Sequence, residues 1–267
     1  MTATIDPAWL EHAKEIARRM AEEGPEDFCS WPSIYLTMFG HPREQTWHEL
    51  GYLRARPDWK TRWVPALVED KVGNPPPCPF YPASSGNLIH HAWQVAKFEE
   101  ATGIPVHNVG RVFEFGGGYG SMCRLLRRLG MTGDYMILDL PELGKLQQWY
   151  LGQLGLMAAM TADSDRVRDW LENSIRDQPL GWSLFIATWS LSEVPIEARA
   201  PILEVASQCD AFLICYQDNF KELENTAAFA LWQATMPEID WKVMPIGYMP
   251  GNTQMMGRAR PFQKEEP

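Results

Sequence analysis

The residues best suited to chemistry lie at positions 112–120, Val-Phe-Glu-Phe-Gly-Gly-Gly-Tyr-Gly. An apolar run that predicts a strand ends in glycines at 116, 118 and 120, and helical spacing begins directly afterwards. Glycine has no Cβ, so the backbone can turn sharply and let a ligand approach closely. The first amides of the following helix face a polar or anionic group. The segment therefore predicts a ligand-binding turn between a strand and a helix.

The glycine spacing separates two classes of ligand. A dinucleotide turn, G-x-G-x-x-G, that starts at Gly116 needs a glycine or a small equivalent at the position of Ser121. The observed pattern is instead E-x-G-x-G-x-G, from Glu114 to Gly120. A carboxylate two positions before the first glycine suits a ligand with a cationic amino group and suits a pyrophosphate poorly. A nicotinamide-dependent oxidoreductase is therefore disfavoured, and a purely structural strand–helix turn is the remaining alternative.

This motif resembles the first motif of the class I S-adenosylmethionine-dependent methyltransferases. The resemblance implies that the cofactor S-adenosyl-L-methionine is lined by the glycines of the turn. It also implies that Glu114 serves the methionine amino group of the cofactor, directly or through water. The glycines assigned to the cofactor site are Gly116, Gly117, Gly118 and Gly120.

A second acidic position agrees with a nucleoside ligand. Asp139 ends the second predicted strand, 19 residues after Gly120. In a doubly wound sheet this strand neighbours the first, so a carboxylate at its end can accept both ribose hydroxyls. A helix cap before Pro141 is the alternative. An aspartate that binds ribose hydroxyls would also fit NAD, so only the glycine spacing distinguishes NAD from S-adenosylmethionine.

Three more residues at strand ends are assigned to the cofactor. Asp163 follows the third predicted strand, where it would touch the adenine amino group, although such polar residues also cap helices. The other two are Leu140, beside Asp139, and Thr188, at the end of the fourth predicted strand.

Three further segments narrow the resemblance: Ser85–Glu99 with its double histidine, Asp139–Glu142 and Trp189–Glu193. With the glycine turn they resemble the sugar O-methyltransferase family of bacteria, over roughly residues 80–220. The resemblance implies methyl transfer from S-adenosylmethionine to a hydroxyl of a sugar or another small polyhydroxylated metabolite. A nitrogen or phenol acceptor in a natural product stays open, as does a non-catalytic, cofactor-binding subunit.

A hydroxyl is a weak nucleophile, so a base that removes its proton assists the transfer. The candidates are His90, His91 and Glu193, of which Glu193 could also bind sugar hydroxyls or support the next helix. On a helical wheel His91 borders the apolar arc, whereas His90 falls with Gln94 and Lys97 on the polar side, which is usually solvated. We therefore prefer His91 as the base, with His90 as its alternate or a substrate contact. Adjacent histidines point to different helix faces, and we predict no metal.

The acceptor should lie beyond the carboxyl ends of the strands, where open α/β sheets bind ligands. Trp189 follows the fourth predicted strand and would stack on a sugar or close over the cofactor. The residues assigned to the acceptor are Trp189, Ser192, Tyr216 and Asp218.

Apolar runs that alternate with helical segments predict the elements that position these residues. Strands are expected at 111–115, 135–138, 156–160, 183–188 and 211–216, with two antiparallel strands at 241–248 and 253–258. Helices are expected at 87–100, 121–129, 143–154, 167–175 and 201–207. The pattern predicts an α/β fold: a Rossmann-like, seven-stranded, doubly wound sheet of the class I methyltransferase type, with an N-terminal helical extension.

Residues 75–79, Pro-Pro-Pro-Cys-Pro, form a stiff connector where we place a domain boundary. Residues 81–267 then form the cofactor-binding domain. Residues 1–80 are expected to be helical, beginning with a helix capped by Asp6, and to cap the substrate cleft or to make a contact in a homodimer.

Composition limits the partners of the chain. Its 267 residues include 24 Lys and Arg against 34 Asp and Glu, a net charge of −10, which is unsuited to neutralising a nucleic acid backbone. No apolar stretch approaches a membrane span, and no secretory signal is visible at the N-terminus. Five cysteines without a CxxC pair suit a reducing compartment. We therefore expect a cytoplasmic protein with a small-molecule substrate, no nucleic acid partner and no membrane contact.

Overall fold

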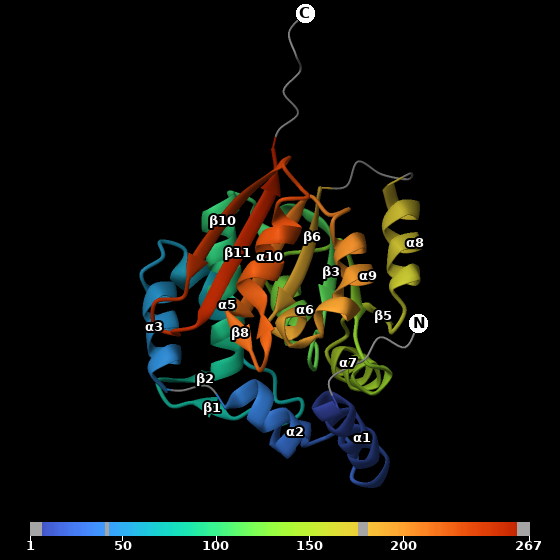
Figure 1. Cartoon of the computed structure of the whole chain (residues 1–267). Helices are drawn as coiled ribbons and strands as arrows, with labels where there is room; N and C mark the ends of the chain where they lie inside the picture. The colour runs from blue at the N-terminus through green and yellow to red at the C-terminus, as the bar shows by residue number, and fades with distance from the viewer. Residues whose placement is uncertain (1–6, 41–42, 176–180, 261–267) are drawn as a thin grey trace, which may run out of the picture.

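A seven-stranded sheet forms the centre of the molecule (Figure 1). The computed structural model describes residues 7–40, 43–175 and 181–260. Within them the strand order is β10-β11-β7-β6-β3-β4-β5, in which β5, β4, β3, β6 and β7 are parallel and β11 is antiparallel to both its neighbours. The strands are β3 (Val109–Phe115), β4 (Asp134–Leu138), β5 (Ala159–Thr161), β6 (Trp182–Thr188), β7 (Ala211–Gln217), β10 (Ile239–Pro245) and β11 (Asn252–Ala259).

The order of the strands reverses between β3 and β6. From β3 the chain proceeds outward through β4 to β5, and it then returns to the other side of β3 to form β6. Such a reversal opens a crevice at the carboxyl ends of the strands, which is where open α/β sheets bind ligands.

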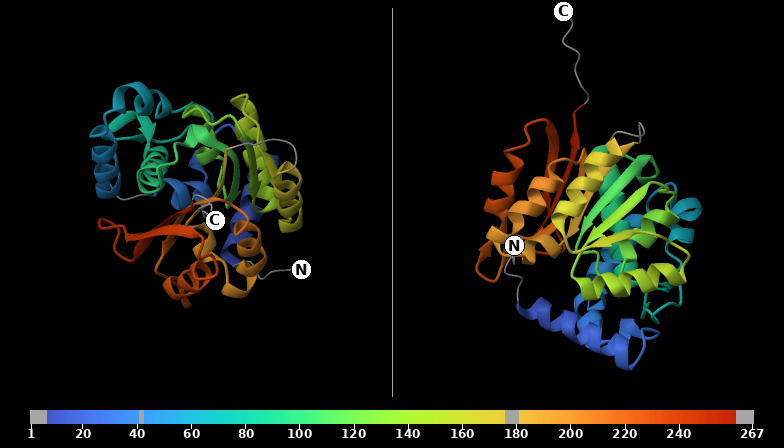
Figure 2. Two further views of the ribbon diagram at one scale, coloured as in Figure 1. Left: turned by 90° about the horizontal axis from the view of Figure 1, so that it is seen from above. Right: turned by 90° about the vertical axis from the view of Figure 1, so that its right-hand side faces the viewer.

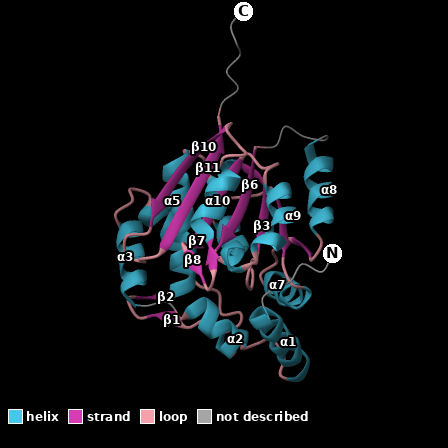
Figure 3. Cartoon of the chain, viewed as in Figure 1, coloured by secondary structure: helices cyan, strands magenta, loops and turns pink. Residues whose placement is uncertain are grey.

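Helices cover both faces of the sheet, as Figure 3 shows by colour. Because side chains alternate along a strand, Val112 of β3 joins one core cluster and Phe113 joins the other. The first face packs against α5 (Gly86–Thr102), α6 (Ser121–Arg128) and α7 (Pro141–Gln153). The second packs against α8 (Ser164–Ile175), α9 (Ile196–Ala206) and α10 (Asn225–Gln233).

Of the N-terminal elements, the first two helices lie across the end of the sheet toward which β3 and β6 point, whereas the third packs against α5 at one side (Figures 1 and 2). They share the first core cluster with the sheet: Phe28 packs 5.2 Å, centroid to centroid, from Tyr119 beside the glycine turn. These elements are α1 (Pro7–Glu22), α2 (Pro32–Ile34), α3 (Arg43–Arg54) and α4 (Val64–Ala66), with short helical turns η1 (Phe28–Ser30), η2 (Tyr35–Phe39) and η3 (Trp59–Trp63) between them.

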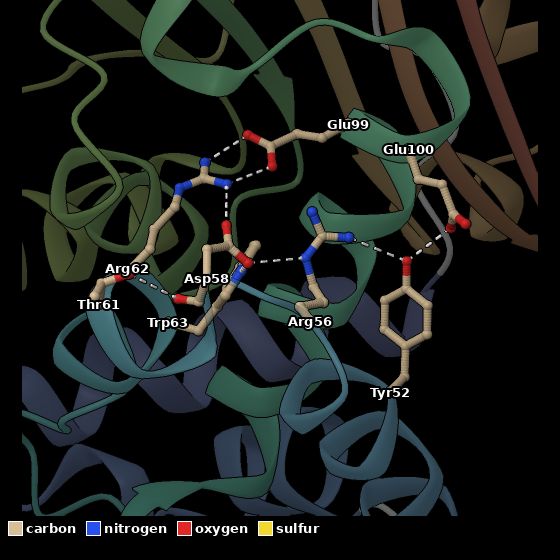
Figure 4. Close-up of polar contacts among 8 residues, drawn as sticks. All are labelled: Tyr52, Arg56, Asp58, Thr61, Arg62, Trp63, Glu99 and Glu100. Atoms are coloured by element: carbon tan, nitrogen blue, oxygen red, sulfur yellow. Dashed lines mark hydrogen bonds and ion pairs between the residues drawn. The ribbon is translucent and has the colours of Figure 1, made fainter.

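Several polar contacts hold this region against the rest, and two of them differ in burial. The partly buried Arg62 guanidinium forms two hydrogen bonds, of 2.6 and 2.5 Å, with Glu99 of α5 (Figure 4). In the interior, the fully buried Arg124 of α6 donates to Asp70 at 2.8 Å and to the carbonyl of Ala66 at 2.9 Å. Breaking a buried ion pair costs more than breaking a partly exposed one, because it leaves an uncompensated charge in the interior. The contacts of Arg124 therefore hold the N-terminal region more firmly than those of Arg62 do.

The predicted Rossmann-like, doubly wound sheet of seven strands is confirmed, including its antiparallel C-terminal pair. Helices α3 and α10 were not predicted, and β5 begins later than expected. The proline cluster contributes the short strand β1 (Pro77–Cys78), which pairs with β2 (Tyr81–Ser85), and a second small pair joins β8 (Asn219–Phe220) to β9 (Leu223–Glu224). The expected cap at Asp6 lies outside the described residues, and the domain division at residue 80 stays a prediction.

Candidate active site

A cleft of about 1450 Å³ opens at the carboxyl ends of the parallel strands. The glycine turn after β3 forms one part of its wall, and the N-terminal end of α5, the loop after β6 and α1 form others. Small-molecule sites usually measure about 300–1,000 Å³. The cleft therefore has room for a nucleoside cofactor together with a second small molecule.

The glycine turn needs glycine for conformational and for packing reasons. Gly116 has a φ of 70° and Gly118 a φ of 57°, which disfavour other residues. A Cβ at Gly116 would also lie 2.3 Å from the Cβ of Ser190. Gly116, Gly117 and Gly118 line the cleft, whereas Gly120 does not: with a φ of 98° it caps the start of α6. Gly120 was assigned to cofactor contact, but in the structure it turns the chain into α6.

Glu114 lies almost fully buried beneath the glycine turn and lines the cleft. Its Oε2 accepts a hydrogen bond of 2.7 Å from the hydroxyl of Tyr135. Burial raises the pKa of Glu114 to about 8 despite this bond, with a smaller contribution from Asp139. A cationic ligand group beside the carboxylate would offset that desolvation, so the site favours a cation over a phosphate.

Asp139 lines the cleft at the end of β4. Its Oδ1 accepts from the backbone amide of Leu140 at 2.8 Å, and its Oδ2 accepts from Nε2 of Gln147 at 2.7 Å. Desolvation raises the pKa of Asp139 to about 7, while these donors and the amides of Gly117 and Gly118 lower it. The carboxylate is thus held in a fixed orientation beside the glycine turn.

The double histidine lies near the N-terminal end of α5. The side chain of Ser85 caps α5 by accepting from the amide of Leu88 at 3.1 Å, which fixes where the helix begins. Both His90 and His91 line the cleft. The expected solvated position of His90 is wrong, because α3 and the Tyr248 loop cover that face and leave His90 only 4% exposed.

Trp189 directly follows β6, and its side chain lies beside His90. Its φ of 65° is strained for a bulky residue, and strain of this kind is concentrated at functional sites. Its Nε1 donates to Oδ1 of Asn252 at 2.7 Å, and its ring centroid lies 4.8 Å from that of His90. The cleft is therefore lined by an indole beside an imidazole.

Glu193 lines the cleft at its α1 side. Its Oε2 accepts a hydrogen bond of 2.8 Å from Nε1 of Trp9, and its Oε1 accepts one of 3.2 Å from Nε2 of Gln217. The N-terminal helix is thus tied to the loop that follows β6.

The remaining sequence-predicted residues divide into two groups. Leu140, Asp163 and Thr188 line the cleft as expected. Ser192, Tyr216 and Asp218 do not line it. Ser192 is fully buried and donates to the carbonyl of Trp189 at 2.6 Å, Tyr216 packs against Phe229, and Asp218 accepts from Thr253 at 2.6 Å.

Tyr216 of β7 was wrongly expected to line the cleft, because the predicted strand did not show which of its residues face the cleft. Residues alternate between the two faces of a strand, so Gln217 reaches the cleft while Tyr216 joins the core on the other face. Sequence reasoning missed Gln217 for this reason. The other missed cleft or supporting residues lie in segments without a motif: Trp9, His12, Glu49, Tyr248 and Asn252.

The described residues contain no group of three His, Cys, Asp or Glu side chains that could hold a metal ion. The five cysteines are buried and unpaired with one another. Over the same part of the chain no helix is long and apolar enough to cross a bilayer.

Comparisons with known proteins extend only to the fold. No protein-family model and no curated protein matches the chain. Among solved structures, an rRNA methylase from Streptococcus thermophilus is 13% identical, with a TM-score of 0.43, over 64% of this chain and 94% of that one. An O-methyltransferase family protein from Burkholderia thailandensis is 13% identical, with a TM-score of 0.41, over 83% and 70%. A fibrillarin pre-rRNA processing protein from Methanococcus jannaschii is 6% identical, with a TM-score of 0.43, over 58% and 69%. At these scores the likenesses do not decide the activity.

Proposed function

We propose that the chain is an S-adenosylmethionine-dependent O-methyltransferase that acts on a hydroxyl of a sugar or a similar small polyhydroxylated metabolite. The observation that carries the proposal is that the glycine turn, its two carboxylates and a buried histidine line one cleft.

The residues of the glycine turn fit this cofactor. Its amino group would offset the desolvated carboxylate of Glu114, whose pKa burial raises to about 8. Its ribose hydroxyls would meet Asp139, whose orientation Gln147 and the amide of Leu140 already fix. A diphosphate would bring no cation to either carboxyl and would be repelled by each carboxyl in its ionised form. NAD is therefore the less favoured ligand.

When bound, S-adenosylmethionine supplies a methyl group already activated as a sulfonium, so the main task of the protein is to align the acceptor. His90, His91 and Glu193 are the groups at the cleft that can hold or accept the proton of the acceptor. The indoles of Trp9 and Trp189 offer flat apolar faces for a sugar ring.

A small acceptor agrees with the charge of the chain better than RNA does. The net charge of −10 opposes binding to a phosphate backbone, although two of the similar structures are described as an rRNA methylase and a pre-rRNA processing protein. The proposal of no nucleic acid partner rests on this charge. A cytoplasmic location and a homodimer remain expectations from the sequence.

Isothermal titration calorimetry with S-adenosylhomocysteine and with NAD tests the cofactor. We expect the first to bind in the micromolar range or tighter and the second not to bind. Binding of NAD alone would overturn the proposal. A methylation screen with labelled S-adenosylmethionine then tests the acceptor: transfer to a nitrogen or phenol would correct the acceptor class, and cofactor binding without any transfer would favour a non-catalytic subunit.

A further inference from the structure

A buried polar contact joins three segments that are far apart in the sequence. Glu49 of α3 is 1% exposed, and its Oε1 lies in hydrogen-bond contact with Nδ1 of His90. The same oxygen accepts a hydrogen bond of 3.1 Å from the hydroxyl of Tyr248, in the loop between β10 and β11. A role for Glu49 was not predicted, because α3 itself was not predicted.

We infer that Glu49 is a positioning residue that sets His90, rather than His91 or Glu193, as the catalytic base of the methyl transfer. This inference rests on the proposed function and deepens it. It assigns an essential chemical role to the N-terminal region, which the cofactor motif alone does not require.

The hydrogen bonds on Oε1 determine the tautomer of the imidazole. The hydroxyl of Tyr248 donates to Oε1 of Glu49, so this oxygen is an acceptor. Because Oε1 is an acceptor, its contact with His90 requires that Nδ1 carry the hydrogen. In a neutral imidazole the lone pair then belongs to Nε2. Nε2 is the nitrogen that can take a proton from an acceptor in the cleft.

The ring of His90 is also held in place by its neighbours. The indole of Trp189 lies 4.8 Å from it, centroid to centroid, and that of Trp93 lies 6.3 Å away with an interplanar angle of 13°. Because these contacts prevent the imidazole from rotating, Nε2 keeps one orientation in the cleft. Efficient proton transfer requires a base that is held in a fixed orientation.

The proton and electron balance of the step is complete without another reactant. The acceptor oxygen forms a bond to the methyl carbon while the carbon–sulfur bond breaks and its electron pair stays on sulfur. The proton of the hydroxyl passes to Nε2 of His90, and the carboxylate of Glu49 stabilises the imidazolium that results. The proton leaves to solvent before the next turnover.

The two other candidates fit this role less well. Both carboxylate oxygens of Glu193 already accept hydrogen bonds, from Trp9 and Gln217, which engage the side chain in joining α1 to the loop after β6. His91 is half-buried at the cleft wall, whereas His90 is 4% exposed and is held against Glu49.

Nuclear magnetic resonance of ¹⁵N-histidine-labelled protein tests the tautomer without any acceptor. We expect His90, assigned by comparison with His90→Gln, to carry its hydrogen on Nδ1 at pH 7.5. A hydrogen on Nε2 in the wild type would overturn the inference. In Glu49→Gln we expect the Nδ1–H signal to shift or to be lost. Glu100→Gln is the matched control, since Glu100 also accepts from a tyrosine, Tyr52 at 2.7 Å (Figure 4), but does not line the cleft.

Kinetics with labelled S-adenosylmethionine and a panel of hexoses, 6-deoxyhexoses and inositols tests the role. We expect Glu49→Gln to lower kcat at least tenfold and to leave KM within about twofold, while His90→Gln lowers kcat by roughly 10²–10⁴-fold. Glu100→Gln should match the wild type. A wild-type kcat in Glu49→Gln would overturn the inference. Should Glu49→Gln fail to fold, Glu49→Asp keeps the charge and should retain the Nδ1–H tautomer with a reduced kcat.

The two proposals can fail separately. If S-adenosylhomocysteine does not bind the wild type, the proposed function fails whatever the state of His90. If it binds and the panel is methylated, but His90 carries its hydrogen on Nε2 or Glu49→Gln keeps its kcat, only the role of Glu49 fails.

Discussion

The two ends of the cleft are built in different ways. The cofactor end comes from one short stretch, in which Glu114, the glycine turn and Asp139 lie on β3, β4 and the loops that follow them. The opposite end comes from residues that are distant in sequence. Trp9 and Glu193, which share a hydrogen bond, are 184 positions apart, and Glu49 and Tyr248 are 199 positions apart.

This difference implies that the two ends depend on different parts of the fold. The sheet positions the carboxylates of the cofactor end, because parallel strands bring their carboxyl ends to one edge. The other end forms only when α1 and α3 pack onto the β6 loop and α5. Changes in α1 and α3 should therefore leave cofactor affinity intact while altering the rest of the cleft, whereas Phe28 and Phe39 pack on Tyr119 of the glycine turn itself.

The largest expected effect concerns Asp139. Replacing it with alanine removes the acceptor for both ribose hydroxyls, each a hydrogen bond to a charged group worth about 1.5–3 kcal/mol. The two bonds together amount to about 3–6 kcal/mol, so we expect Asp139→Ala to lower the affinity for S-adenosylhomocysteine more than about 100-fold by calorimetry. Asp134→Ala, at the exposed opposite end of the same strand, is the control and should bind as the wild type does. An affinity of Asp139→Ala within threefold of wild type would contradict the assignment.

The second effect is a pH dependence confined to the cofactor end. Burial raises the pKa of Glu114 to about 8 and that of Asp139 to about 7, so both carboxyls are partly protonated near neutrality. A ligand with an ammonium group prefers the ionised forms. We therefore expect the affinity for S-adenosylhomocysteine to rise about tenfold from pH 6 to pH 8.5 and binding to release protons. Glu114→Gln should flatten the profile; an unchanged profile would exclude Glu114 from the effect.

The same shift has a consequence for stability. Because folding raises the pKa of Glu114 from 4.5, its contribution to the free energy of unfolding is fully present below pH 4.5 and is lost as the pH rises through 8. The glutamine of Glu114→Gln does not titrate. In the absence of ligand, the melting temperature of Glu114→Gln relative to that of the wild type should therefore rise between pH 5 and pH 8.5. A constant difference over this range would contradict a protonated Glu114.

The smallest effect concerns α1. Trp9→Phe removes the hydrogen bond to Glu193 and should weaken the docking of α1 by about 1 kcal/mol. We expect tryptic cleavage within α1 to accelerate about fivefold while the affinity for S-adenosylhomocysteine stays within twofold. Trp47→Phe, at an exposed indole on α3, is the control. A parallel loss of cofactor affinity would show that the two ends of the cleft are not independent.

The sequence allowed most of the sheet to be predicted because local signals defined it. Apolar runs marked the parallel strands, and the turn around Pro250, Gly251 and Asn252 marked the antiparallel pair. Helix α3 escaped prediction because its single buried face carries Leu50 and Leu53 beside Glu49, so its apolar periodicity is weak. Its position is set by packing on α5 rather than by propensity.

The site was predictable to the extent that it is local. The carboxylates and glycines of the cofactor end were assigned from their spacing together with the family resemblance, and all but Gly120 line the cleft. His90 was placed on a solvated face because a helical wheel contains no information about a covering helix. Glu49, Trp9 and Tyr248 could not be assigned, because long-range packing alone brings them to the histidine and to Glu193.

A crystal structure with S-adenosylhomocysteine tests the cofactor assignment most directly. We predict that its amino group lies beside Glu114, that both ribose hydroxyls contact Asp139, and that its sulfur faces the wall formed by His90 and Trp189. A nucleoside seated elsewhere, or a sulfur turned away from the histidine, would contradict the assignment of the two ends of the cleft.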